Sequence, residues 1–172
     1  GDEWLSSVPI HLQLFKVFNF KAPKYAHISP LLKEENGNRR KLSKRKDPEA
    51  AISFYHEKGI PTEAVLLYLC TVANSNFEMW YLQNKDKTVD DFKLEFKKIS
   101  SSGSLFDVEK LINISRNYIS LLKASEVYDK TLEYSKTYDL ELYNLLTKYK
   151  DYSINVLNIE REQKKPRKDL AM

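Results

Sequence analysis

Glycine and cysteine are both scarce in this sequence, which holds four Gly and one Cys among 172 residues. Few positions can therefore adopt a positive φ without strain, and a composition rich in Lys, Leu, Tyr and Glu leans towards helix. A single cysteine, Cys70, excludes an internal disulfide, which fits a reducing cytoplasm. Because Cys70 lies within the apolar run 65–72, we expect it to be a buried structural thiol.

Several kinds of site are missing as well. No run of about 18 apolar residues occurs, so no membrane span is expected. The three His and the Cys lack the spacing of paired metal ligands, and no two glycines lie close enough to form a Gly-rich phosphate cradle. Any phosphate contact must come from Lys and Arg side chains and from backbone amides. The sequence begins Gly1-Asp2-Glu3-Trp4, which is neither Met nor a signal peptide, and we expect the chain to be a piece of a longer protein.

The positive charge is clustered. The net charge of +4 is modest, but six of the eight residues from Arg39 to Lys46 are basic, and so are five of the eight from Arg161 to Lys168. Clustered Lys and Arg suit phosphate backbones and nucleotides. The alternative is a solvated loop and a solvated tail, and charge alone does not decide between the two.

The first 46 residues predict one helix and one hairpin. Ser7 as a cap and a proline in the first turn indicate a helix over Pro9–Phe18. A short strand over 24–28 is expected to run on through 30–32. Asn36-Gly37 is a strong hairpin signal, so the first basic run would form the returning strand and the loop after it.

From Asp47 onwards, the sequence predicts helices. Asp47 as a cap begins one helix, which Gly59 ends, and Pro61 opens the next. A Thr-x-x-acid box at Thr88 and a cap at Asp107 indicate two more helix starts.

Between those two starts, the serine-rich segment 100–104 is the best candidate for a flexible loop. The last third repeats Tyr and Leu at helical spacing. A stripe formed by Leu142, Leu145, Leu146 and Tyr149 is expected to be core.

One basic loop suggests chemistry. Lys41-Leu42-Ser43-Lys44-Arg45 follows the expected hairpin and precedes a capped helix. Such a loop places ammonium groups and a hydroxyl around a triphosphate and neutralises the charge that develops as pyrophosphate departs. A basic pentapeptide alone is weak support for this function, since surface loops often have such a composition.

The same pentapeptide resembles the second signature motif of class I aminoacyl-tRNA synthetases, in the form used by glutamate–tRNA ligases. Its surroundings resemble that family too, in the expected order from Gly1 to about Leu122. The similar segments are Gly1–Pro9 (the floor of the active site), His27–Leu32 (the strand leading to the loop), Asp47–Ala64 (the helix pair) and Phe106–Leu111 (the next helical landmark). From Lys123 on the resemblance is looser.

The resemblance implies site residues. Lys44 would contact the ATP phosphates as a catalytic residue together with Lys41, while Ser43 and Arg45 would support the loop. The remaining implied residues are Glu3 (ATP binding), Trp4 (a wall of the glutamate pocket), and Leu31 and Leu32 (flanking the adenosine). The structural alternatives are a surface Glu3, a core Trp4 and two ordinary strand leucines. No metal site is implied beyond Mg²⁺ carried by ATP.

The implied architecture is mainly α. It comprises the remnant of a nucleotide-binding α/β domain with short strands and a hairpin (1–46), a helical stem-contact domain (47–122) and the start of a helical anticodon-binding region (123–172). The implied enzyme is a cytoplasmic monomer that activates L-glutamate with ATP and attaches it to tRNA(Glu). The family's first signature, of the His-x-Gly-His type, does not occur here, so we expect the chain to be inactive by itself.

Three alternative functions remain open. One is a glutaminyl-type tRNA ligase, and another is a truncated relative that modifies tRNA. The third, from a different class, is a non-enzymatic helical RNA-binding module, which the basic runs and the many tyrosines allow. The ordered series of similar segments favours the glutamate enzyme.

Overall fold

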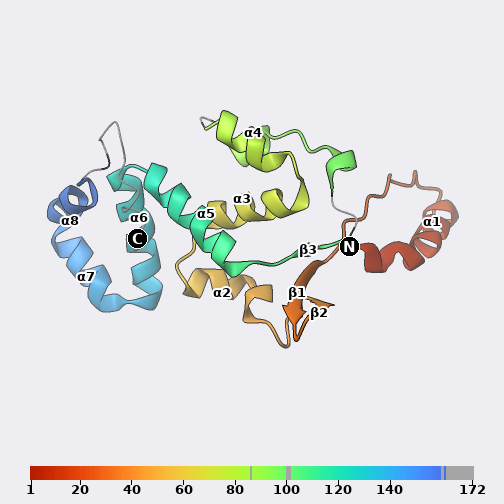
Figure 1. Ribbon diagram of the computed structural model, residues 1–172, viewed down its shortest axis with the longest axis horizontal. Coiled ribbons are helices and arrows are strands. Elements are labelled where there is room, and N and C mark those ends of the chain that lie inside the picture. Colours follow the sequence, from red (N-terminus) through yellow and green to blue (C-terminus); the bar gives the residue numbers. More distant parts are fainter. Residues whose placement is uncertain (86, 100–101, 160, 162–172) are drawn as a thin grey trace. The chain divides into compact units, whose positions relative to one another are not determined.

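The computed structural model describes residues 1–85, 87–99, 102–159 and 161 (Figure 1). It is mainly helical with one three-stranded sheet, which confirms the predicted fold class. The chain forms two compact units. The first unit contains Gly1–Lys46 and Leu69–Phe106, and the second contains Asp47–Tyr68 and Asp107–Met172. Within the described part of the chain, no helix is long and apolar enough to cross a membrane.

The first unit begins with a 3-10 turn, Asp2–Ser7, that leads directly into α1, Val8–Val17. The helix predicted over Pro9–Phe18 is therefore confirmed. Ser7 occupies the N-cap position but has helical φ and ψ, and its side chain makes no cap hydrogen bond. The preceding turn makes the cap unnecessary, because backbone groups upstream continue the helical path.

The sheet has the order β2-β1-β3. Strand β1, Leu31–Glu35, pairs antiparallel with β2, Asn38–Lys41, across a two-residue turn. Asn36 (φ 54°) and Gly37 (φ 76°) both adopt the positive φ that a type I′ hairpin turn requires, so the predicted hairpin is confirmed. The short strand β3, Ser104–Leu105, pairs parallel with the other edge of β1.

Two expectations for this region differ from the structure, the first over its whole length and the second at Ser104. No strand forms over 24–28, where the Ile28 carbonyl accepts a hydrogen bond from the Asp2 amide (3.1 Å). Pro30 has no amide to donate, and the strand begins only after it. Of the predicted loop 100–104, residues 100 and 101 lie outside the described residues, and Ser104 belongs to β3, where its hydroxyl donates to the Val72 carbonyl (2.9 Å).

The first unit also contains α4, Phe77–Gln83, and the segment that follows it. The capping box predicted at Thr88 forms, with the Thr88 amide donating to Asp91 Oδ2 (2.8 Å). The helix expected to start there is wrong, since the residues described up to Ile99 form the 3-10 turns Val89–Asp91 and Phe96–Lys98 instead. Phe92 is extended instead, and its ring packs edge-on against buried Phe77, with centroids 5.0 Å apart. Tertiary packing of the ring here outweighs the local helix signal.

The second unit is built from helices. They are α2 (Ile52–Glu57), α5 (Val108–Leu121), α6 (Ala124–Tyr138), α7 (Leu140–Lys148) and α8 (Lys150–Leu157), together with the first part of α3 (Thr62–Ala73), which both units share.

The predicted helix ends in the second unit are mostly confirmed. The Asp107 carboxylate caps α5 by accepting from the Lys110 amide (3.0 Å), and Gly59 (φ 65°) ends α2. The helix expected from Asp47 is wrong at its start. A 3-10 turn, Pro48–Ala50, comes first, and Ala51 is extended, so α2 begins only at Ile52.

In the part of the second unit that the structure describes, seven apolar side chains are buried: Ala64, Leu67, Tyr68, Leu111, Ala124, Tyr128 and Leu146. Both tyrosine hydroxyls are satisfied, since Tyr68 accepts from the Asp107 amide (2.7 Å) and Tyr128 donates to the Leu146 carbonyl (3.1 Å). Of the apolar stripe predicted as core, Leu146 is buried, whereas Leu145 and Tyr149 are each 48% exposed. That stripe is therefore only partly core.

Cys70 is half-buried rather than buried. Burial raises the pKa of its thiol, which keeps it protonated and weakly reactive.

Candidate nucleotide-phosphate site

The base of the hairpin is joined to the N-terminal turn by an ion pair. Lys41, the last residue of β2, donates from Nζ to Glu3 Oε1 at 2.6 Å across 38 positions of sequence. In the sheet, Lys41 pairs with Leu32. Three residues that the family resemblance assigns to ATP binding therefore lie at one place in the first unit.

This ion pair shifts the titration of the carboxylate. The pKa of Glu3 is lowered to about 2, chiefly by the hydrogen bond from Lys41 and then by its own backbone. The side chains are 45% and 55% exposed, for Glu3 and Lys41 respectively. Exposed ion pairs add little to stability, so this contact positions its two charges rather than holding the fold together.

The loop after β2 is organised by its backbone and by Ser43. The Leu42 amide donates to the Leu31 carbonyl (2.9 Å), and the Lys46 amide closes a turn on the Ser43 carbonyl (3.1 Å). The Ser43 hydroxyl accepts from the Arg45 amide (3.4 Å).

The cationic side chains of this loop remain open to solvent. Lys44 and Arg45 are exposed, and neither has an ion-pair partner among the described residues. The loop therefore exposes two cationic side chains on a backbone that hydrogen bonds hold in place. Such an arrangement is suited to binding a polyphosphate.

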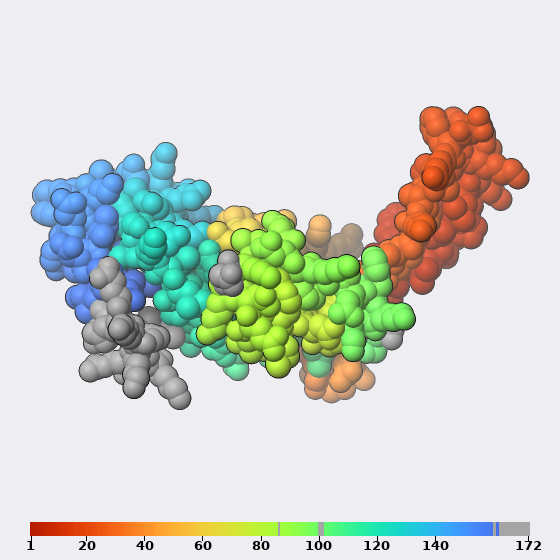
Figure 2. Space-filling model, turned by 90° about the horizontal axis from the view of Figure 1, so that it is seen from above, coloured from red at the N-terminus to blue at the C-terminus, as the bar shows by residue number. Residues whose placement is uncertain are grey.

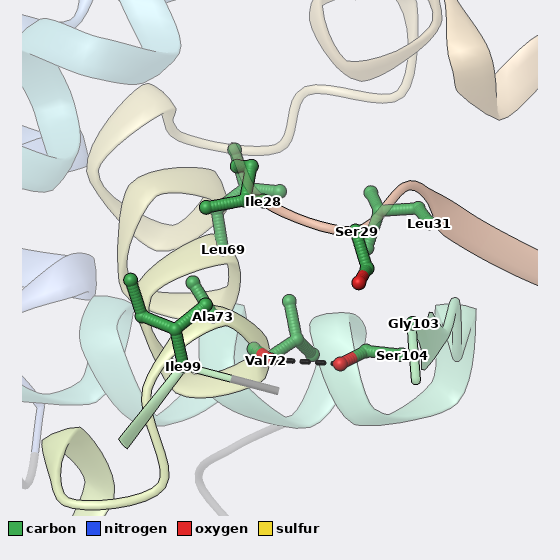
Figure 3. A pocket seen from close by; sticks show the side chains of 9 residues that line it. All are labelled: Ile28, Ser29, Leu31, Leu69, Val72, Ala73, Ile99, Gly103 and Ser104. Atoms are coloured by element: carbon green, nitrogen blue, oxygen red, sulfur yellow. Dashed lines mark hydrogen bonds between the residues drawn. The ribbon is translucent and has the colours of Figure 1, made fainter. Parts of the chain in front are cut away.

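The two strand leucines face different surroundings. Leu31 lines a cavity of about 220 Å³, together with Ile28, Ser29, Leu69, Val72, Ala73, Ile99, Gly103 and Ser104 (Figure 3). Its walls carry no charged side chain, and the Ser104 hydroxyl is already bonded to Val72. Leu32 instead packs on Gly103, where an added Cβ would lie 2.9 Å from Leu32 Cδ1. The close approach of this leucine therefore requires the glycine.

Trp4 stands at one end of a ladder of aromatic rings. Its side chain is 57% exposed, and its centroid lies 6.4 Å from that of His11. The ladder continues from His11 to Tyr25 and from Tyr25 to His27, again at 6.4 Å each. His27 Nδ1 lies 3.0 Å from the Gly1 carbonyl. Sequence reasoning missed this ladder, because its rings come from separate segments and no spacing joins them.

The contacts described in the first unit bring Glu3, Lys41 and Leu32 together but give no direct contact from that group to Trp4 or Lys44. The second basic run, 161–168, lies outside the described residues except for Arg161. The Arg161 guanidinium donates to the Ile119 and Leu122 carbonyls (2.9 and 3.2 Å), so in this structure it braces the C-terminal end of α5.

Comparison with known proteins identifies the chain's relatives. A family model described as tRNA synthetases class I (E and Q), catalytic domain, matches residues 1–113. A glutamate–tRNA ligase of Clostridium perfringens (strain 13 / Type A) is 48% identical over 171 residues, which cover 99% of this chain and 31% of that protein. The glutamate–tRNA ligase of Acetivibrio thermocellus is 45% identical over 170 residues, with the same coverage. The chain thus spans about a third of the length of these relatives.

A solved structure has a similar fold. It is a glutamate tRNA ligase from Elizabethkingia meningosepticum in complex with its amino acid, with a TM-score of 0.62 and 21% identity. The match covers 94% of this chain and 34% of that one.

Proposed function

We propose, since this chain belongs to the class I (E and Q) tRNA synthetase family, that it forms part of a glutamate–tRNA ligase. The complete enzyme would activate L-glutamate with ATP, with Mg²⁺ on the nucleotide, and attach the glutamate to tRNA(Glu). Both curated relatives described above carry that name, which supports glutamate over glutamine as the amino acid. We also propose that the enzyme is a cytoplasmic monomer and that the chain alone does not charge tRNA.

The observation that carries the proposal is the Lys41–Glu3 contact at 2.6 Å. Two residues that the resemblance assigns to ATP binding, far apart in sequence, are held together where the basic loop begins. In this reading Lys44 contacts the phosphates, Lys41 assists it, and Ser43 and Arg45 support the loop. Glu3 and Leu32 would complete the ATP site, and Trp4 would form a wall of the glutamate pocket.

The chemistry this loop would perform is electrostatic. The glutamate carboxylate attacks the α-phosphorus of ATP, a P–O bond to the β-phosphate breaks, and pyrophosphate leaves with additional negative charge. Ammonium groups already positioned near the β- and γ-phosphates stabilise that charge as it develops. Transfer of the glutamyl group to the terminal ribose of the tRNA then depends mainly on orientation.

The role of each segment is also part of the proposal. Residues 1–46 would complete the nucleotide-binding domain, 47–122 would contact the tRNA stem, and 123–172 would begin the anticodon-binding region.

Lys44→Ala in the complete enzyme tests the assignment. Glutamate-dependent exchange of pyrophosphate into ATP, measured with tRNA present, should slow by at least about 100-fold, because a preorganised charge contact is lost. Lys46→Ala removes the same charge from the same loop outside the assigned set and should stay within about threefold of wild type. Equal effects of the two variants would rule out a specific role for Lys44. Exchange driven by glutamine rather than glutamate would favour the glutaminyl alternative.

A further inference from the structure

Lysines and an exposed aromatic ring occur together in a short segment of the first unit. The segment lies within 47–122, which is proposed above to contact the tRNA stem, but none of its side chains has yet been given a role. The segment Lys93–Lys98 contains three lysines, one glutamate, one leucine and one phenylalanine, and we call it the Lys93–Lys98 strip. It includes the 3-10 turn Phe96–Lys98. In Figure 2 the green stretch of chain that contains it lies at the surface of the face in view.

The strip is held to the turn after α3 by a buried side chain. Asn74 is 1% exposed, and its Nδ2 donates to the Glu95 carbonyl (2.9 Å). Asn76 Nδ2 donates to Glu95 Oε1 (2.9 Å), and the Ser75 amide donates to the Lys98 carbonyl (3.2 Å). The backbone of the strip is therefore fixed near its middle and at its end, so binding would not have to order it.

The side chains of the strip point to a polyanion with flat rings. Phe96 is 68% exposed although its backbone is anchored, so its ring is available for stacking. Lys93, Lys97 and Lys98 are exposed, and no carboxylate pairs with them among the described residues. The carboxylate within the strip, Glu95, is engaged by Asn76.

The charge of the two units also favours a polyanion as the ligand of the strip. The first unit has fifteen Lys and Arg against nine Asp and Glu, whereas the second has thirteen against fifteen. A phosphate backbone is attracted where cations exceed anions. The helices of the second unit, although they would hold tRNA in the proposed enzyme, do not supply that excess.

We propose that the Lys93–Lys98 strip is an RNA-contacting surface. The ammonium groups of Lys93, Lys97 and Lys98 would contact backbone phosphates, and Phe96 would stack on a base that is free of its own stack, such as one in a loop or a bend. This deepens the proposed function, on which it rests for the identity of the RNA as a tRNA. Asn74 acts as a positioning residue.

The test measures binding of the 172-residue chain to a fluorescently labelled tRNA transcript by anisotropy, from about 50 to 200 mM salt. Phe96→Ala should weaken binding about tenfold at every salt concentration, because stacking is lost without loss of charge. The double variant Lys97→Ala/Lys98→Ala should lower the slope of log K against log salt by about 1 to 2. The double variant Lys21→Ala/Lys24→Ala, which removes the same charge elsewhere in the first unit, should change that slope less.

Two results would overturn the proposal. Unchanged affinity of Phe96→Ala would leave only a non-specific attraction of charges. Equal slopes for the two lysine double variants would show that position does not matter. Phe96 is exposed, so its variant should fold, and unchanged circular dichroism and melting would verify this.

Assays of the complete enzyme distinguish a failure of this proposal from a failure of the proposed function. With saturating tRNA, Phe96→Ala should retain glutamate-dependent pyrophosphate exchange but require more tRNA for half-maximal charging. Absence of that exchange in the wild type would defeat the ligase assignment and leave the anisotropy result on the strip standing.

Discussion

The two compact units differ in what they bury and in what they expose. Among the described residues, seven of the eight buried apolar side chains belong to the second unit, and the first contributes Phe77. The first unit instead exposes large apolar groups along α1, seen in red on the face in view in Figure 2, and carries the excess of basic residues. Burial is therefore concentrated in the second unit, whereas the residues proposed to bind ATP and the Lys93–Lys98 strip lie in the first. A site with little core of its own depends on local contacts such as Lys41–Glu3 to hold its geometry.

The largest expected change in the free energy of unfolding comes from a substitution in the core of the second unit. Leu111 is fully buried, and Leu111→Ala should lower the free energy of unfolding by about 3 kcal/mol through lost burial and a residual cavity. Leu14→Ala in α1, where the side chain is half exposed, is the control and should cost less than about 1 kcal/mol. Urea unfolding of both variants measures the contrast, and equal losses would refute an unequal division of stability.

Two glycines with positive φ, one in each unit, allow the same comparison for the backbone. Gly59→Ala should cost about 1–2 kcal/mol, because the position has a φ of +65° and the new Cβ would lie 3.3 Å from Tyr134 Cε2. Gly37→Ala in the hairpin turn has a similar φ of +76° but open space around it, and should cost about 1 kcal/mol. Thermal unfolding compares them. A larger loss at Gly37 would mean that packing around Gly59 is looser than the distance indicates.

A surface ion pair of the second unit should contribute less to the free energy of unfolding than the buried leucine or the two glycines. Lys130 Nζ lies 2.7 Å from Glu63 Oε1, with both side chains more than a third exposed, so Lys130→Ala should cost under about 1 kcal/mol at pH 7. Burial pushes the pKa of Glu63 up, but hydrogen bonds from Lys130 and from its own backbone outweigh burial and the net pKa is lowered. A lowered pKa means that the contribution is present above the unfolded pKa and is lost as pH falls through the folded one. The difference between wild type and variant should therefore shrink in acid, and urea titrations at pH 7 and pH 3 check this.

The smallest expected effect on stability is at the candidate site. The Glu3 carboxyl should titrate at about 2 in an NMR pH series, and Lys41→Ala should move its midpoint up towards 4.5, because the largest cause of the shift is removed. Since the pKa is depressed, the ion pair persists through neutral pH and fails only as pH falls towards 2.

The free energy of unfolding should not change measurably in Lys41→Ala, since both groups are exposed. Lys46→Ala serves as the control, with an unmoved midpoint. A Glu3 midpoint near its ordinary value in wild type would contradict the contact.

The sequence predicted what is locally encoded. Asn36-Gly37 specifies its own turn geometry, and Asp107 satisfies an orphan amide three residues ahead, so both were foreseen correctly. The helix predicted after Thr88 failed because the ring of Phe92 packs on Phe77, a partner that no local pattern reveals. The strand expected at 24–28 failed because, in the described parts of the chain, no strand pairs with it.

The candidate site likewise contains some residues that the sequence predicts and some contacts that only the fold creates. The loop residues Ser43, Lys44 and Arg45 are contiguous and could be picked out from composition and resemblance. The approach of Lys41 to Glu3 joins residues 38 positions apart, and the Lys93–Lys98 strip depends on buried Asn74. Neither arrangement has a spacing rule, because both arise from tertiary contacts.

The outer position of β2 in the sheet has one more consequence. Its residues, Asn38-Arg39-Arg40-Lys41, border an edge of the sheet with which no further strand pairs among the described residues. Arg39 adds a cation to that edge, whereas Arg40 and Lys41 are each paired with a carboxylate, that of Glu35 and that of Glu3. Charged side chains along an edge strand hinder another strand from adding to it. The charged side chains of β2 thus protect the hairpin from pairing with a second copy of itself, so replacing Arg39 and Arg40 by neutral residues should favour aggregation.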